Sequence, residues 1–181
     1  MNETVFVFSP KGDILELPQG ATPLDFAFAI HTQIGCKCVG AKVNGKIVTL
    51  DYKLQNGDRV EIITAKNSKG PAKDWLDIVV THGAKSKIRK LLKDSIMEET
   101  IKIGRENLER ELGKLGISLK EMEDDPIIKK HMEKNNINNL DEFYFHVGEK
   151  RSKIDVIIKK LKNSFTGWKF KMIDITLQSH L

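Results

Sequence analysis

Residues 26–45 read FAFAIHTQIGCKCVGAKVNG and contain the transition that decides the fold of the first half of the chain. An apolar run with helical spacing reaches His31, meets Gly35, and gives way to a strand-like segment that ends at Asn44-Gly45. Asn-Gly between two β-type segments is a strong signal for a two-residue hairpin. The stretch therefore predicts a helix followed directly by a β-hairpin.

The start of this helix is predicted at Thr22-Pro23, with Asp25 in the first turn. A threonine N-cap satisfies a free amide, and proline at the first helical position lacks the N–H that would otherwise be unpaired. We expect the helix to run to about Gln33, with Gly35 in the left-handed conformation just past its end.

Two apolar stripes on this helix compete for burial. The first stripe consists of Leu24, Ala27, Phe28 and His31. The second has no polar member and consists of Phe26, Ala27, Ile30 and Ile34. We expect the second stripe to face the core because it is longer and more β-branched. His31 would then lie partly buried at the rim, near a helix C-terminus that favours a cation. From the pattern alone, this capping role competes with a binding role.

The segments on either side complete a small domain over residues 1–64. Short β-branched runs separated by turn residues predict strands at 5–8 and 14–17, two more around Asn44-Gly45, and a last one within 54–64. The order strand, strand, helix, strand, strand, strand predicts an α+β fold of the β-grasp, ubiquitin-like kind.

The periodicity becomes helical beyond a polar linker at 65–73, and predicts a small all-helical domain over 74–165. Ser118 with Glu121 predicts a helix start, and Gly113 and Gly116 predict the end of the preceding helix. Apolar stripes mark three successive helices: Ile88, Leu91 and Leu92, then Ile101, Leu108, Leu112 and Leu115, then Ile154, Ile157, Ile158 and Leu161. Residues 166–181 fit neither pattern, and we expect a further strand or a disordered tail.

Composition limits the class of protein. The chain has 181 residues, of which 40% are apolar and 30% charged, and no apolar run approaches the ~20 residues that span a bilayer. The N-terminus has no secretory signal pattern. We expect a cytoplasmic protein in which Cys36 and Cys38 stay reduced, since two neighbouring thiols alone make neither a good disulfide nor a zinc site. No metal or cofactor is expected.

The net charge of +5 is uneven. Residues 65–95 and 127–181 each carry +5, and residues 96–126 carry −4. Basic blocks can contact phosphate backbones, although a solvated helix face is the simpler interpretation. No phosphate-binding glycine loop, metalloprotease motif or nucleophile elbow occurs, so the sequence indicates no catalytic residues.

Several segments together resemble the TGS domain of the long RelA/SpoT proteins, which make and hydrolyse guanosine tetra- and pentaphosphate. They match in order and spacing: PKGD, GATPLDFA, IHTQIG, GAKVNGKIV and NGDRVEIIT. GPAKDWL and GRENLERELGKLGISLKE then resemble the helical domain of the same family. The resemblance covers residues 4–165. The hydrolase, synthetase, zinc-finger-like and ACT modules of the family have no counterpart here, so we expect a non-catalytic middle part of a longer protein.

The resemblance implies a regulatory, RNA-sensing role beside the catalytic domains of the parent protein. In the family, the histidine of the I-H-T segment meets the 3′ CCA end of deacylated tRNA on the ribosome, and by position this is His31. Further phosphate contacts are expected from Lys37, Lys42 and Lys46, unless these are edge-strand lysines that oppose aggregation. Ribosomal RNA is expected to meet the row formed by Lys85, Arg89 and Lys93.

Two other roles remain open. β-Grasp domains often bind proteins, and the resemblance allows an interaction module for acyl carrier protein or a GTPase. An autonomous enzyme is the third interpretation, and it has the least support because no catalytic constellation is visible.

Overall fold

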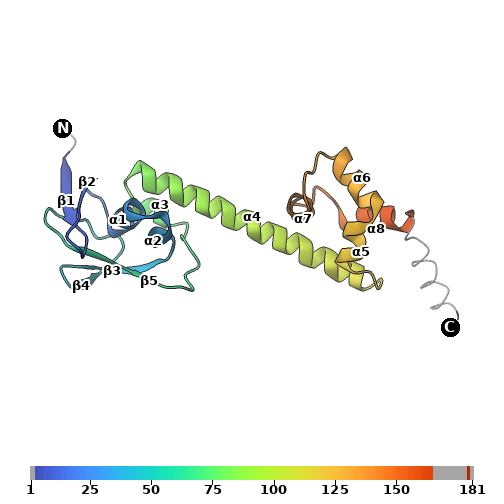
Figure 1. Ribbon diagram of the computed structural model, residues 1–181, viewed down its shortest axis with the longest axis horizontal. Coiled ribbons are helices and arrows are strands. Elements are labelled where there is room, and N and C mark those ends of the chain that lie inside the picture. The colour runs from blue at the N-terminus through green and yellow to red at the C-terminus, as the bar shows by residue number, and fades with distance from the viewer. Residues whose placement is uncertain (1–2, 165–178, 180–181) are drawn as a thin grey trace. The chain divides into compact units, whose positions relative to one another are not determined.

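A computed structural model of the chain describes residues 3–164 and 179 (Figure 1). The chain folds as two compact units, residues 1–95 and 96–181. The divisions expected at residues 64, 73 and 165 stay a prediction, and the predicted tail at 166–181 lies outside the described residues apart from Ser179.

The first unit contains the strands, and the predicted α+β, β-grasp architecture is confirmed. β1 pairs with β2, and β3 pairs with both β4 and β5, all antiparallel. A parallel bridge between Phe8 and Arg59 joins the two sheets. The strands are β1 (Thr4–Phe8), β2 (Ile14–Pro18), β3 (Cys38–Val43), β4 (Lys46–Val48) and β5 (Val60–Thr64).

The hairpin between β3 and β4 turns at Asn44-Gly45, as predicted. Both turn residues have positive φ, 52° for Asn44 and 81° for Gly45. This is the requirement of a type I′ turn, whose twist matches that of the flanking strands. Asn44 is held in place because its side chain donates to Asp58 and accepts from the Arg59 amide.

Two short helices follow β2 where the sequence predicted one. α1 (Pro23–Ile30) begins at the predicted Thr22 cap, where Thr22 and Asp25 form a capping box. His31 is extended, and α2 (Thr32–Cys36) begins after it. The expectations of a helix to Gln33 and of a left-handed Gly35 are therefore wrong. Gly35 lies inside α2, where any side chain would come within 3.0 Å of the Phe28 ring, so it permits close packing instead.

α1 is buried on two sides, so the preference for a single stripe is also wrong. Phe26 packs in one cluster with Val7 and Leu54. Leu24 and Phe28 pack in a second cluster, which the segment after the sheet covers. Ile30, a member of the preferred stripe, is 39% exposed. The second cluster is completed by Cys38, Trp75, Val79, Ala84 and Ile88.

The helices that supply this cover begin with α3 (Trp75–Ile78) and α4 (His82–Gly113). The sequence predicted two helices where α4 is one, because residues 93–101 lack a stripe but also contain no glycine or proline to stop a helix. Its N-terminus is capped by Thr81, whose hydroxyl accepts from the Ala84 amide.

The second unit is helical among its described residues, and the predicted stripes form its core. Leu108, Leu112, Ile157 and Leu161 are all at most 1% exposed. Ser118 caps α5 as predicted, by accepting from the Glu121 amide. Its helices after α4 are α5 (Leu119–Asp124), α6 (Pro126–Lys134), α7 (Leu140–Gly148) and α8 (Ile154–Lys162).

α4 and α7 cross at two glycines. A Cβ on Gly104 would fall within 3.0 Å of the Tyr144 carbonyl oxygen, and one on Gly148 within 3.0 Å of the Thr100 carbonyl oxygen. The two backbones therefore touch, and glycine is required at both positions for this packing distance. The GRENL segment begins with one of them, although its sequence alone did not indicate this role.

Candidate nucleic-acid interface

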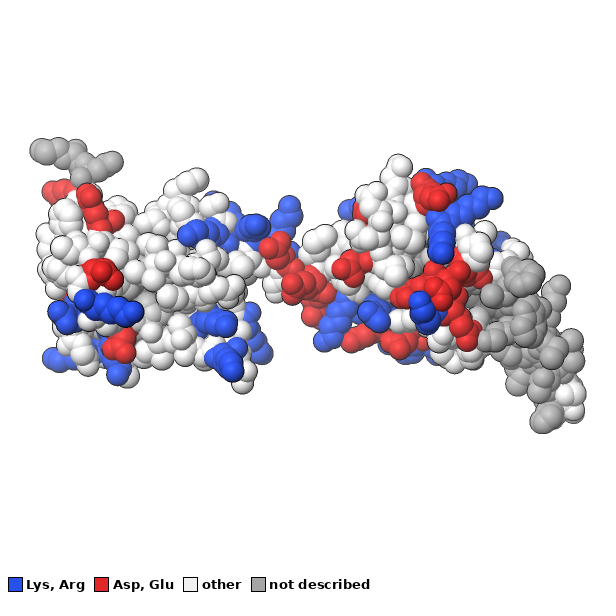
Figure 2. Space-filling model, viewed as in Figure 1, with Lys and Arg blue, Asp and Glu red and all other residues white. Residues whose placement is uncertain are grey.

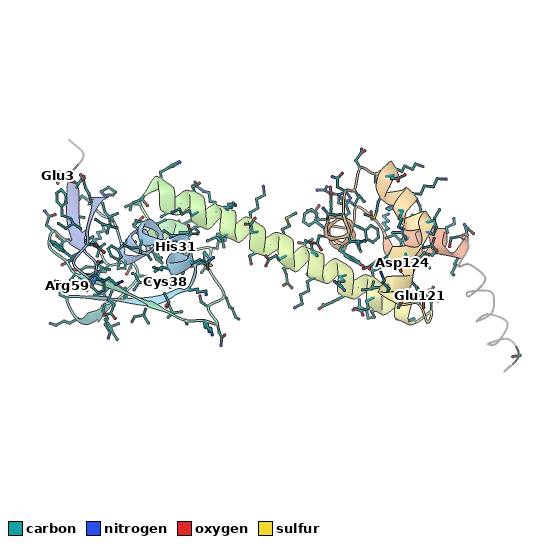
Figure 3. All side chains as sticks on the ribbon, viewed as in Figure 1. Glu3, His31, Cys38, Arg59, Glu121 and Asp124 are labelled. Atoms are coloured by element: carbon teal, nitrogen blue, oxygen red, sulfur yellow. The ribbon has the colours of Figure 1, made fainter. Side chains whose placement is uncertain are left out.

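His31 lies at the joint between α1 and α2 and serves both helices. Its backbone N–H donates to the Ala27 carbonyl oxygen at 3.2 Å, which closes the last turn of α1. Its side-chain Nδ1 accepts from the Gln33 amide at 3.0 Å, which caps α2. The side chain is exposed, in contrast to the half-buried position expected for it (Figure 3).

The cap determines what the ring can offer to a ligand. Because Nδ1 accepts a hydrogen bond, the neutral imidazole carries its proton on Nε2. Nε2–H is then a donor for a ligand, and the exposed ring can also stack on a base. The cap holds the ring in one orientation, so its partner meets a pre-formed group.

A mainly apolar groove of about 260 Å³ adjoins this joint. Ile30 directly precedes His31, and Ile34 lies in α2; both line the groove. The opposite wall is β5, and the turn after β1 closes one end. The remaining lining residues are Ser9, Pro10, Phe26, Val60, Glu61, Ile62 and Thr64.

The β5 wall is an open strand edge. β1 lies beside the start of β5, where the Phe8 amide donates to the Asp58 carbonyl oxygen at 2.8 Å. β1 then turns away, since the Ser9 amide bonds to Asp13 instead. Within residues 3–164, no strand other than β3 pairs with Val60–Thr64. Backbone donors and acceptors on the outer edge of β5 can therefore bind a ligand in the groove.

Lys37 is the lysine that the structure associates with His31. It ends α2, which His31 begins, and it is exposed. Lys42 lies within β3, opposite Ile47 and Glu61, and Lys46 begins β4. The length of β3, about 20 Å at 3.3 Å per residue, separates the hairpin turn from Lys37. No contact among the described residues joins Lys42 or Lys46 to His31.

Lys85, Arg89 and Lys93 occupy one face of the first turns of α4, within the first unit. Arg89 and Lys93 are exposed and Lys85 is half-buried, while Ile88, next to Lys85 around the helix, faces the core. Figure 2 shows Lys and Arg side chains along this part of α4. The row is therefore available to a phosphate backbone.

Two residues for which the sequence predicted no long-range contact hold the site in place. Lys87 Nζ donates to the Phe28 carbonyl oxygen at 3.0 Å, so a cation does lie at the α1 C-terminus, but it comes from α4 and is not His31. Asp25, fully buried, accepts from Thr22 and also from the amides of Val80 and Thr81 at 2.9–3.2 Å. α1 is thus tied at both ends to the segment around the start of α4.

The sequence contains a signal for each of these two residues, but its meaning depends on a distant segment of the chain. Asp25 fits a capping box, which explains it fully without a long-range role. Lys87 lies between the lysines of the predicted basic row. α1 has no basic residue in its last turn, and this gap could have suggested a cation from elsewhere.

The two thiols are free and lie on different elements. Cys36 is in α2 and Cys38 begins β3, so they do not share a strand face. Burial raises the pKa of the Cys38 thiol, and its hydrogen bond to the Gly40 carbonyl oxygen opposes that change only in part. Among the described residues, no group of three or more His, Cys, Asp or Glu side chains could hold a metal ion. No helix in the same part of the chain could cross a bilayer.

The architecture defines a class: a ubiquitin-like module followed by a helical module. Residues 5–64 match the TGS domain model, and residues 91–162 match the RelA/SpoT AH domain model. The chain belongs to the RelA/SpoT family and carries its regulatory TGS and AH domains.

Curated relatives agree with this family. The chain is 54% identical over 110 residues to a GTP pyrophosphokinase of Myxococcus xanthus, covering 61% of this chain and 14% of that protein. It is 40% identical over 181 residues to one of Haemophilus influenzae, covering 98% and 23%. It is 44% identical over 121 residues to the bifunctional (p)ppGpp synthase/hydrolase RelA of Mycobacterium tuberculosis, covering 66% and 16%. The chain thus spans less than a quarter of the length of these relatives.

Proposed function

We propose that this chain is an RNA-sensing segment that binds the 3′ CCA end of deacylated tRNA through His31 and the groove beside it. The observation that carries the proposal is the exposed His31 ring, fixed by its Nδ1 cap, next to the open edge of β5. Unpaired bases are read by stacking and by hydrogen bonds to their edges. The imidazole ring would stack on a base, and Nε2–H and the β5 backbone would form hydrogen bonds to base edges.

Discrimination against aminoacylated tRNA follows from the size of the groove. A space of about 260 Å³ accommodates a single base or ribose, not both an adenosine and an attached amino acid. A free 3′ hydroxyl fits against the β5 backbone, whereas an aminoacyl group would collide with the wall formed by Ile30, Ile34 and Ile62. Selection is therefore by exclusion.

Phosphate contacts would add affinity without sequence information. Lys37 would meet the backbone of the CCA end. Lys85, Arg89 and Lys93 would meet ribosomal RNA, and removing all three should lower the salt dependence of binding by up to about three in the slope of log K against log salt. In the whole protein, the sensed state would then pass to the catalytic domains, which would make or hydrolyse guanosine polyphosphates.

The test compares deacylated with aminoacylated tRNA, bound to the chain in the presence of ribosomes. His31→Asn is the decisive variant, because asparagine is a good N-cap and keeps α2 capped while the ring is lost. Loss of one stacked base should weaken binding of deacylated tRNA about 5- to 150-fold. Gln33→Ala is the matched control, since the amide that His31 accepts from is unchanged. Equal binding of both tRNAs, or tight binding by His31→Asn, contradicts the proposal.

A second candidate function rests on the same open edge. An extended peptide could add a strand to β5 and place an apolar side chain in the groove. Acyl carrier protein or a GTPase would be the partner in this case. Binding of such a protein by the chain, with no binding of either tRNA, would favour it over RNA sensing.

A further inference from the structure

The second unit buries an imidazole that the proposed RNA contact does not use. His131 in α6 is 8% exposed. Its Nε2 lies 3.3 Å from the Ser152 hydroxyl, and its Nδ1 lies 3.1 Å from Lys160 Nζ in α8. The amide nitrogen of Asn135 is 3.4 Å from the same Nδ1. The ring therefore joins the end of α6 to α8.

The partners determine the protonation state of this ring. The Lys160 ammonium has only hydrogens to donate, so Nδ1 presents its lone pair and the neutral ring carries its proton on Nε2. Burial lowers the pKa of His131 first, and the charges of Lys160, His146 and Lys134 lower it further. The geometry and the charges thus agree on a neutral ring at pH 7.

The groups that face His131 are cationic or neutral. They come from each element packed against it: Lys134 and Asn135 at the end of α6, Lys160 in α8, Ser152 ahead of α8, and His146 and Phe143 in α7. α6 and α8 together contain six lysines and two carboxylates. Figure 2 shows Lys and Arg side chains gathered over α6, with Asp and Glu gathered over α5 instead.

Within residues 3–164, no ion pair neutralises Lys134 or Lys160. The Lys160 ammonium thus contacts the buried ring, and the charge of Lys134 also acts on it, while no carboxylate in the described part of the chain pairs with either lysine. A lysine in the last turn of a helix is favoured by the dipole, which accounts for the presence of cations there. It does not account for an imidazole that must stay neutral between them.

We propose that α6 and α8 form a phosphate-binding site in the helical unit, in which Lys134, Lys160 and His131 bind phosphate oxygens. An incoming phosphate reverses the local charge. His131 then takes up a proton from solvent at Nδ1, keeps it, and donates a hydrogen bond from this N–H to a phosphate oxygen, while Lys160, released from Nδ1, turns to the same anion. The ligand class is a compound with clustered phosphates, either an RNA backbone or a nucleotide with a diphosphate group.

The site does not depend on the His31 proposal, because all its residues belong to the second unit. The test titrates the chain with pyrophosphate and, separately, with a short RNA duplex and with guanosine tetraphosphate, and follows the assigned ring signals of His131 and His146 by NMR. Comparison of the RNA and the nucleotide identifies the source of the phosphate. The pH arm uses the RNA duplex, because its phosphodiesters do not titrate near neutrality.

Lys134→Ala with Lys160→Ala is the test variant. Lys129→Ala with Lys159→Ala is its matched control, since it removes the same charge from the same two helices at exposed positions that do not act on His131. We expect the test pair to weaken binding by about tenfold or more, as loss of charge-assisted hydrogen bonds does, and the control to change it little. Saturating ligand should raise the pKa of His131, so RNA binding should tighten as the pH falls from 7.5 to 6.

Three results would overturn the proposal. The first is no binding of any of the three probes at 0.15 M salt. The second is an equal loss in both variant pairs, which would indicate attraction to net charge alone. The third is binding that leaves the His131 ring signals unchanged.

Discussion

Glycine has one role in the turns of the first unit and another at the helix crossing of the second. In the first unit, Gly12, Gly20, Gly45 and Gly57 have φ between 81° and 90°, and a Cβ on any of them would meet no atom within 4 Å. In the second, Gly104 and Gly148 lie on helices and a Cβ on either would collide with the facing backbone. In the first case glycine allows the backbone conformation of the turns, and in the second it allows the close approach of two helices.

The two units also differ in the surroundings of a buried ionisable group. Asp25 accepts from N–H and O–H donors of three residues and joins α1 to the start of α4. His131 lies among cations, and its surroundings favour the neutral ring. A fully paired carboxylate acts as a structural tie, whereas an imidazole beside unneutralised lysines leaves charge available for a ligand.

The largest loss of stability is expected from Asp25→Ala, which tests whether the paired carboxylate stabilises the first unit. Its loss leaves the amides of Thr22, Val80 and Thr81 without the buried carboxylate that accepts from them, and breaking such a charged network costs about 3–5 kcal/mol. Urea unfolding followed by Trp75 fluorescence measures it, in a background where Trp168 is replaced by phenylalanine.

Asp51→Ala is the control for this change, because Asp51 is exposed and lies in the same unit. Its free energy of unfolding should change by less than about 0.5 kcal/mol. A comparable loss of unfolding free energy in both variants would mean that the hydrogen bonds of Asp25 do not stabilise the first unit.

Gly104→Ala is expected to have the next largest effect. The added methyl group must push α4 and α7 apart at their crossing, and overpacking of this kind costs about 1–3 kcal/mol. Gly113→Ala is the matched control on the same helix, where a Cβ meets no atom within 4 Å. Thermal unfolding by circular dichroism compares the two. If Gly104→Ala is as stable as Gly113→Ala, the helices do not touch through their backbones.

The smallest effect is a pH dependence of the second unit. The folded pKa of His131 lies below its unfolded value of about 6.5, so the unfolded chain binds more protons between these two values. The stability of the second unit is therefore full above about pH 6.5 and falls as the pH is lowered toward the folded pKa.

His131→Gln removes the titrating group and should flatten this dependence between pH 7.5 and 5. The measurement is the urea concentration at the midpoint of unfolding of the second unit, followed by the NMR signals of amides in α7 and α8 at each pH. A midpoint that falls equally in both proteins would assign the dependence to another group, of which His146 is the nearest candidate.

Local rules predicted much of the first unit. The Asn44-Gly45 turn and the Thr22 cap each depend on a few neighbouring residues, so the sequence showed them directly. The break at His31 was not predicted. It brings Gly35 of α2 against the ring of Phe28 in α1, a contact that the spacing of apolar residues does not show. The stripe on α1 was misjudged for a related reason: a helix covered on two sides has no single apolar face.

The candidate site shows the same division. The resemblance indicated His31, and its exposure and its cap on α2 came only from the structure. The groove could not be predicted, since it forms where β1 leaves β5, and that depends on the pairing of Ser9 with Asp13. The role of Lys87 was hidden within a basic row, where spacing alone cannot distinguish a tie to α1 from a phosphate contact.

The cover over Leu24 and Phe28 has a practical consequence for anyone who isolates the TGS domain. Truncation after residue 64 would keep all the strands found within residues 3–164 and yet remove Trp75, Val79 and Ile88, which shield these two side chains. The truncated polypeptide would expose these apolar side chains to solvent, which promotes aggregation, and Asp25 would lose its hydrogen bonds from Val80 and Thr81. The smallest version of the TGS domain that folds on its own must therefore retain the first turns of α4.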